Sequence, residues 1–271
     1  MRLSIHHTTT YSYSEPQRMI EQSHRLYPSE CQGQRLLSWD VEASGANFGS
    51  YFYDGAGDRI RTMSIAKTQS VEIQVTGEIE TTDNNGVVIN ARDKVNPLVY
   101  LRTSEVTLPG DKLKAAALEA ISSTNSTQLE QAHAMTGYIN NAIAYASGAT
   151  DNSYTAERAL EQGSGVCQDQ THCLIAISRL NNIPARYVTG YLHTDAQGDS
   201  HDASHAWAEL YIDDLGWVGF DPTNTCCPDD RYIRIGSGID AWGAALIRGI
   251  SRGVGQESMD VTVQINGMQQ Q

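Results

Sequence analysis

Alternation of apolar and polar residues with a period of two predicts strands in the first part of the chain. The clearest example is residues 70–79, where Val71, Ile73 and Val75 fall on one face. Shorter stretches of the same kind precede it and are separated by turn clusters rich in glycine, asparagine and aspartate. We therefore expect residues 1–108 to form a β-rich N-terminal domain that is similar to a small β-sandwich.

Beyond Pro109 the spacing of apolar residues becomes helical, and after Pro184 it returns to that of strands. Predicted helices cover 112–122, 126–144 and 155–162, a further helix begins within 163–177, and predicted strands cover 185–192, 205–212 and 217–221. The pattern thus indicates an α+β protein in which residues 109–271 form a second domain after the β-rich one.

One glycine-rich stretch, residues 163–177, combines a turn signal with the start of a buried helix. Gly163 and Gly165 allow a sharp turn, and from Cys173 onward apolar residues recur with helical spacing. Cys167 therefore lies at the predicted N-terminus of the helix, where the helix dipole favours a thiolate. A thiolate is a nucleophile at neutral pH, and the uncovered N–H groups of the first turn can bind an oxyanion.

Two predicted strands joined by a short turn carry a histidine and an aspartate, His205 and Asp221. A three-residue turn pairs Ile212 with Gly216 and brings His205 and Asp221 to diagonal positions on one face. A four-residue turn would place them on opposite faces. If His205 and Asp221 act together they require the three-residue turn, and Gly216 can supply the positive φ that such a turn needs, so this is the turn that we expect.

In the first of these strands the residues at even positions are apolar and are expected to face the core. The residues at odd positions are expected to face a cleft or solvent: His205, Trp207, Glu209 and Tyr211. Trp207, Gln168 and Tyr154 are candidate substrate-binding residues, and Tyr154 is also a candidate donor to an oxyanion.

A cysteine, a histidine and a carboxylate are the groups that nucleophilic acyl chemistry requires, because they supply the nucleophile, the proton carrier and the group that orients it. The sequence carries them in four blocks: 165–169, 183–191, 204–207 and 216–224. These blocks resemble the bacterial transglutaminase-like superfamily, a branch of the papain-like cysteine proteinase fold. The resemblance implies that Cys167 is the nucleophile, His205 the base and Asp221 the orienting carboxylate.

The resemblance extends to residues 1–80, which are similar to the β-rich N-terminal domain of the bacterial members. Two departures concern the expected substrate subsites. Gln170 and Thr171 stand where these members usually carry an aromatic and then a small residue. In the family, arginine and aspartate commonly stand after the glycine that corresponds to Gly236, whereas here Ser237 and Gly238 stand there.

The formal net charge of −13 and the lack of lysine and arginine clusters argue against nucleic acid and anionic membranes as partners. No apolar run approaches the roughly 20 residues of a membrane helix and no signal segment opens the chain, so we expect a cytoplasmic location. The five cysteines include the adjacent pair Cys226–Cys227, whose spacing fits neither a disulfide framework nor a zinc site. We expect no metal and no cofactor.

The predicted function is thiol-dependent acyl chemistry on amide bonds of a protein or peptide substrate, with hydrolysis favoured over transfer to an amine. Three alternatives stay open: a protein-glutamine transglutaminase, an acyltransferase acting on a small thioester or arylamine, and a non-catalytic peptide-binding module. A metal-dependent hydrolase that uses Cys226 and Cys227 is the fourth and weakest alternative. The sequence leaves the oligomeric state open.

Overall fold

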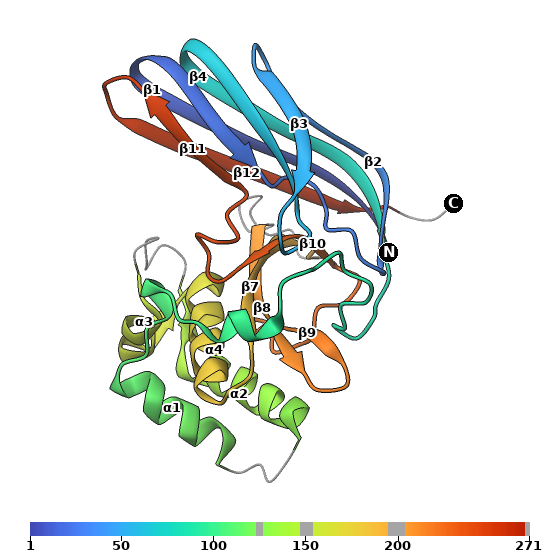
Figure 1. Cartoon of the computed structure of the whole chain (residues 1–271), viewed down its shortest axis with the longest axis vertical. Coiled ribbons are helices and arrows are strands. Elements are labelled where there is room, and N and C mark those ends of the chain that lie inside the picture. The colour runs from blue at the N-terminus through green and yellow to red at the C-terminus, as the bar shows by residue number, and fades with distance from the viewer. Residues whose placement is uncertain (123–126, 147–153, 195–203, 269–271) are drawn as a thin grey trace.

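Two long antiparallel strands, β1 (Arg2–His24) and β4 (Arg59–Thr81), organise the N-terminal part of the computed structural model, which describes residues 1–122, 127–146, 154–194 and 204–268. Their pairing is interrupted between Ser12 and Gln17 of β1. At this interruption both strands fold back, so that their two halves lie in two layers (Figure 1).

Shorter strands complete the two layers. β2 (Gln34–Ala43) and β12 (Glu257–Gly267) extend one layer, and β3 (Asn47–Tyr53) and β11 (Ile247–Arg252) extend the other. The layers share one apolar core, to which both contribute: Val71, Ile73, Val75, Ile20, Met63 and Ile65. This arrangement confirms the predicted β-sandwich.

The predicted division at residue 108 needs one correction, because the chain returns to the sandwich at its C-terminal end. β12 pairs with the first half of β1 and β11 with the second half. The predicted second domain, 109–271, therefore includes two strands that belong to the first domain. Alternation within 259–265 marks a strand but does not reveal a hydrogen-bonding partner about 250 residues away in the sequence.

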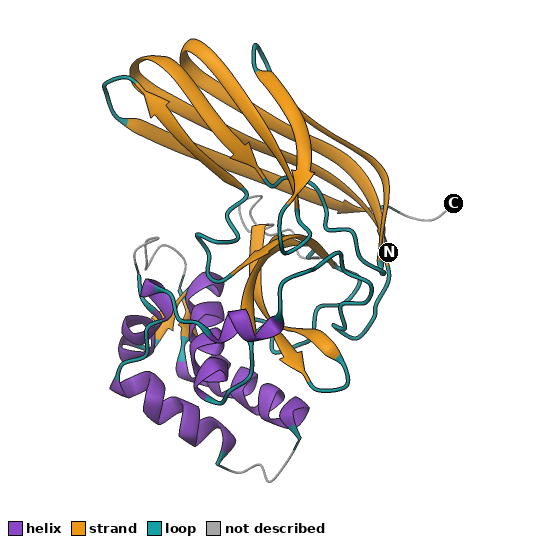
Figure 2. Ribbon diagram, viewed as in Figure 1, coloured by secondary structure: helices purple, strands orange, loops and turns teal. Residues whose placement is uncertain are grey.

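The rest of the chain forms a mixed core below the sandwich (Figure 2). Its helices are α1 (Asp111–Ile121), α2 (Gln128–Ala142), α3 (Ala156–Gln162) and α4 (Cys167–Leu180), preceded by the 3₁₀ turns η1 (Pro97–Leu101) and η2 (Glu105–Thr107). Its main sheet has the order β10-β7-β8-β9, with β7 (Ala185–Leu192), β8 (Ser204–Ile212), β9 (Gly216–Phe220) and β10 (Tyr232–Gly238). The short strands β5 (Ala144–Tyr145) and β6 (Ser164–Gly165) form a separate parallel pair.

Helix α4 is the centre of this core. Every residue from Asp169 to Arg179 is buried, because the other helices cover one side of α4 and the sheet covers the other. The helix ends at Leu180, and Asn182 just beyond it adopts a positive φ of 59°. Its first residue is Cys167, which therefore sits at the boundary between the buried helix and the surface.

The hairpin of β8 and β9 has the register that the sequence predicts. Ile212 pairs with Gly216 across a three-residue turn, and Gly216 has a φ of +81°. The even-numbered residues of β8 face the core beside α4, also as predicted. Of the odd-numbered residues, Trp207 and Glu209 are only 2% and 1% exposed, and both line a small pocket on this second face of the sheet.

A segment after β4 runs along the edge of β9, where Val87 bridges Val218, the backbone N–H of Gly219 donates to Gly86, and the N–H of Val88 donates to Trp217. Its continuation covers the second face of the sheet, where Asp93 pairs with Arg186. A segment without regular structure supplies this cover, so the pattern of the strands alone does not reveal it.

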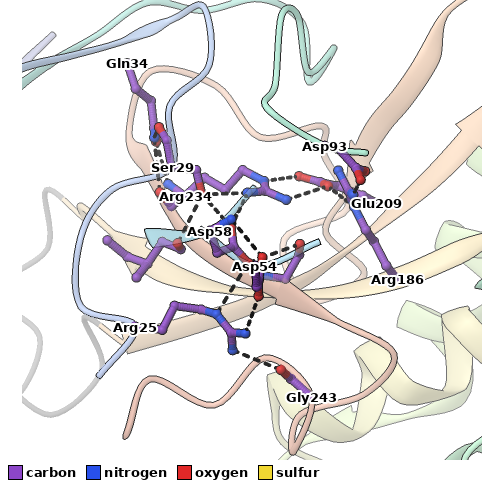
Figure 3. Close-up of polar contacts among 12 residues, drawn as sticks. Arg25, Ser29, Gln34, Asp54, Asp58, Asp93, Arg186, Glu209, Arg234 and Gly243 are labelled. Carbon is purple, nitrogen blue, oxygen red and sulfur yellow. Dashed lines mark hydrogen bonds and ion pairs between the residues drawn. The ribbon is translucent and has the colours of Figure 1, made fainter. Parts of the chain in front are cut away.

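Beneath this cover lies a buried ionic network (Figure 3). Glu209 of β8 accepts hydrogen bonds from the Nε atoms of Arg186 (2.6 Å) and Arg234 (2.7 Å). Arg234 also contacts Asp58, which is paired in turn with Arg25, at 3.3 and 3.4 Å. The network thus joins the sheet that carries His205 to loops of the sandwich.

The charge of Glu209 depends on its two arginines. Burial alone would raise the pKa of this carboxyl group, but the charges and hydrogen bonds of Arg234 and Arg186 outweigh burial and lower the pKa to about 2. Removing the carboxylate would leave two buried guanidinium groups without this partner.

We predict that Glu209→Ala lowers the free energy of unfolding by about 3–5 kcal/mol at neutral pH, because it leaves buried charges uncompensated. Urea unfolding measures this change. The matched control is Glu80→Ala, which breaks an ion pair with the exposed Arg35 and should cost less than about 1 kcal/mol.

The difference between wild type and Glu209→Ala should also shrink as the pH falls from about 4.5 towards 2, where Glu209 takes up its proton. Equal losses for the Glu209 and Glu80 variants would contradict a stabilising role for the network.

Candidate active site

The loop before Cys167 is fixed by its backbone. Gly163 ends α3 in the left-handed conformation with a φ of +68°. The carboxylate of Asp169 accepts the N–H of Val166 at 2.8 Å, and a Cβ atom on Gly165 would lie 2.8 Å from the Asp169 side chain. Glycine at 165 therefore permits the contact that closes the first turn of α4 and sets the position of Cys167.

His205 and Asp221 meet as the hairpin register predicts. Nε2 of His205 lies 2.7 Å from Oδ2 of Asp221, and the two residues are 8% and 0% exposed. Because Asp221 occupies Nε2, the other ring nitrogen, Nδ1, is left for the hydrogen bond that His205 shares with Cys167. The structure thus brings together Cys167, His205 and Asp221, which we call the Cys–His–Asp set.

The contacts of His205 favour its protonated form. Burial opposes a charge on the ring, but the hydrogen bonds and charges of Asp221 and Cys167 outweigh burial and raise the pKa of His205 to about 10. The geometry can therefore support a thiolate beside an imidazolium at neutral pH.

Asp221 has several hydrogen-bond donors besides His205. Its Oδ1 accepts the backbone N–H groups of Thr223 (2.8 Å) and Asn224 (3.2 Å). Its Oδ2 accepts the amide of Asn224 and the hydroxyl of Tyr232, each at 2.7 Å. Burial would raise the pKa of Asp221, but these donors, with His205 first among them, lower it.

The sequence analysis did not identify Asn224 and Tyr232 as part of the site. Asn224 lies close after Asp221 within the block 216–224, so the sequence alone could have indicated that the two side chains lie near each other. Tyr232 reaches Asp221 from β10 across the sheet, and no local pattern indicates that contact.

A cleft of about 710 Å³ opens at the Cys–His–Asp set. One wall comes from the core and includes Cys167, the predicted substrate residue Gln168, and His205. The other wall comes from the sandwich: Tyr11, Tyr13, Ile20, Ile247, Glu257 and Met259. The N-terminal domain therefore forms part of the cleft.

Trp207 and Tyr154, also predicted to bind substrate, are not among the described residues that line this cleft. Trp207 lies behind His205 with their rings nearly parallel, 27° apart with centroids at 6.4 Å. Its edge meets Tyr232 at a centroid distance of 5.4 Å. Tyr154 is 6% exposed and packs in the helical core, with the Arg158 guanidinium over its ring. Both rings make packing contacts in the core, away from the described lining of the cleft at Cys167.

Other cysteines and histidines near the site have structural contacts. Cys173 is fully buried, its thiol donates to the carbonyl of Ala156 at 3.1 Å, and burial raises its pKa. His172 accepts the N–H of Ala241 at 3.1 Å, and burial lowers its pKa to about 4. Among the described residues, no group of three or more histidine, cysteine, aspartate or glutamate side chains could hold a metal ion.

Comparison with known families assigns the chain. Residues 115–222, which contain the Cys–His–Asp set, match the transglutaminase-like superfamily, and residues 3–80 match the bacterial transglutaminase-like N-terminal region. The chain carries a transglutaminase-like core and the bacterial transglutaminase-like N-terminal region. This confirms the resemblance carried by the sequence blocks, and the N-terminal match coincides with the first three strands of the sandwich and nearly all of β4.

Several individual proteins are similar to this chain. An uncharacterised protein of Mycobacterium leprae is 27% identical over 283 residues, which cover 97% of this chain and 98% of that protein. An uncharacterised protein of Mycobacterium tuberculosis is 37% identical over 131 residues, 45% of this chain and 42% of its own length. The crystal structure of a candidate cysteine protease from Cytophaga hutchinsonii matches with a TM-score of 0.79 at 23% identity, covering 100% of this chain and 92% of that one. This last match shows a shared fold.

No helix within the described ranges is both long and apolar enough to cross a membrane.

We predict that iodoacetamide at pH 6.5 alkylates Cys167 faster than Cys173, and that His205→Ala slows the reaction at Cys167 about ten- to a hundredfold. The reason is that an ordinary thiol, with a pKa near about 8.5, is only about 1% ionised at that pH. Peptide mapping by mass spectrometry measures both rates in one sample. A rate at Cys167 that does not change in His205→Ala would contradict the thiolate–imidazolium pair.

Proposed function

We propose that this protein carries out thiol-dependent acyl chemistry on amide bonds of a peptide or protein, with hydrolysis as the main outcome. The observation that carries the proposal is the position of Cys167 at the N-terminus of α4, beside a histidine whose far nitrogen is bound to the buried Asp221. These three residues are the proposed catalytic triad.

In the proposed first step, the Cys167 thiolate attacks the carbonyl carbon of the amide. The negative charge that develops on the carbonyl oxygen is stabilised by N–H groups at the start of α4, which have no partner within the helix. His205 then gives its Nδ1 proton to the departing nitrogen as the C–N bond breaks. This step leaves the acyl group on Cys167 as a thioester and the histidine neutral.

In the second step, His205 takes a proton from water, and the resulting hydroxide equivalent attacks the thioester carbon. The C–S bond breaks, the carboxylic acid leaves, and the thiolate and imidazolium are restored. Throughout both steps, Asp221 keeps its charge and holds the ring of His205 in one orientation.

The cleft supports a polypeptide substrate. Both of its walls carry apolar or aromatic side chains, among them Tyr187, Tyr11 and Ile247, against which the side chains of a peptide can pack. The net charge of −13 disfavours nucleic acid as a partner.

We predict that the wild-type protein releases ammonia or cleaved peptide from a peptide-amide library, and that Cys167→Ala lowers this rate at least about a thousandfold. Mass spectrometry of the products measures the reaction. The matched control is Cys31→Ala, which removes a partly buried thiol that does not line the described cleft and should keep full activity.

A primary amine added to the same reaction separates the two acyl acceptors. Hydrolysis gives the acid alone, and transglutaminase activity gives a product whose mass includes the amine. Tight peptide binding without turnover in both wild type and Cys167→Ala would contradict the proposal and indicate a binding module.

A further inference from the structure

One oxygen atom of Asp221 receives hydrogen bonds from three different residues. Oδ2 lies 2.7 Å from Nε2 of His205, from the amide nitrogen of Asn224 and from the hydroxyl of Tyr232. A carboxylate oxygen has two lone pairs in its plane, so three donors at this distance share its electron density. Each donor therefore weakens the hold of Oδ2 on the others.

The two additional donors are held by their own surroundings. Tyr232 is 4% exposed, its ring packs edge-on against Trp207, and its hydroxyl also contacts the thiol of Cys226 at 3.4 Å. Asn224 lies in the tight loop after Asp221, which is closed by backbone hydrogen bonds between Asp221 and Cys226 in both directions. The two donors also contact each other and His205. The amide nitrogen of Asn224 lies 3.4 Å from the hydroxyl of Tyr232 and 3.5 Å from Nε2 of His205, and the rings of Tyr232 and His205 have centroids 6.0 Å apart.

We propose that Tyr232 and Asn224 are positioning residues that compete with His205 for Oδ2 of Asp221 and so keep the proton of the imidazolium transferable. A carboxylate held by His205 alone would bind that proton more strongly, and a histidine that holds its proton too tightly is a poor acid for the leaving nitrogen. The meaning for catalysis rests on the proposed function, whereas the effect on the titration of His205 does not.

The groups that face this pair come from several elements. Cys167 approaches from α4, Cys226 and Asn224 from the loop after β9, and Tyr232 from β10. Cys167 raises the pKa of His205, so the test uses a Cys167→Ala background, in which His205 titrates at a lower and more accessible pH.

The experiment is a pH titration of His205 by NMR, using protein with ¹³C-labelled histidine rings. Adding Tyr232→Phe to the Cys167→Ala background should raise the pKa of His205 by about 0.5 to 1 unit, because Asp221 loses a competing donor. Asn224→Ala should shift it in the same direction by less, since Asn224 is exposed and water can replace its amide. This second variant also decides the question if Tyr232→Phe fails to fold.

The matched control is Tyr191→Phe, which removes another buried hydroxyl, one that bonds to His7 at 2.7 Å, and should leave the titration of His205 unchanged. An unchanged pKa of His205 in Tyr232→Phe and Asn224→Ala would overturn the proposal, because the two donors would then only pack. A lowered pKa would overturn it as well, because Tyr232 would then hold Asp221 in place for His205 rather than compete with it.

Discussion

The buried hydrogen bond between His205 and Asp221 is the interaction on which the candidate site depends. It exists because the hairpin of β8 and β9 pairs Ile212 with Gly216, which sets both side chains on one face. Asp221 is fully buried, so protein donors rather than bulk solvent surround its carboxylate. A shift of the register by one residue would turn one of the two groups to the opposite face and separate them.

The site also depends on how the sandwich and the core are joined. Glu209 lies on the same strand as His205 and is bound to Arg234, which reaches Asp58 in the sandwich. The sandwich in turn supplies one wall of the cleft at Cys167. The ionic network therefore helps to fix the two walls relative to each other, and the N-terminal domain is part of the cleft.

Local patterns were sufficient for much of this structure. The glycines before Cys167 and the apolar spacing after Cys173 predicted the start of the helix and its buried course, because both are set within a few residues. Gly216 permits the three-residue turn that pairs Ile212 with Gly216 in the hairpin. The contacts that the sequence did not reveal are long-range. β12 pairs with β1, a segment after β4 pairs with β9, and Tyr232 donates to Asp221. In each case the local sequence pattern does not indicate which distant segment is the partner.

In the proposed mechanism, the acyl group of the amide substrate is bonded to the sulfur of Cys167 before water attacks it. For the most direct measurement, the wild-type protein is mixed with a peptide amide that it hydrolyses, and the reaction is quenched rapidly with acid. Intact-mass spectrometry then detects an adduct on the protein, and peptide mapping locates it. We expect a transient adduct on Cys167. The mass that it adds to the protein equals the mass of the peptide minus that of the leaving amine, and hydroxylamine removes it. Product formation without any such adduct, or an adduct on another residue, would contradict the proposed mechanism.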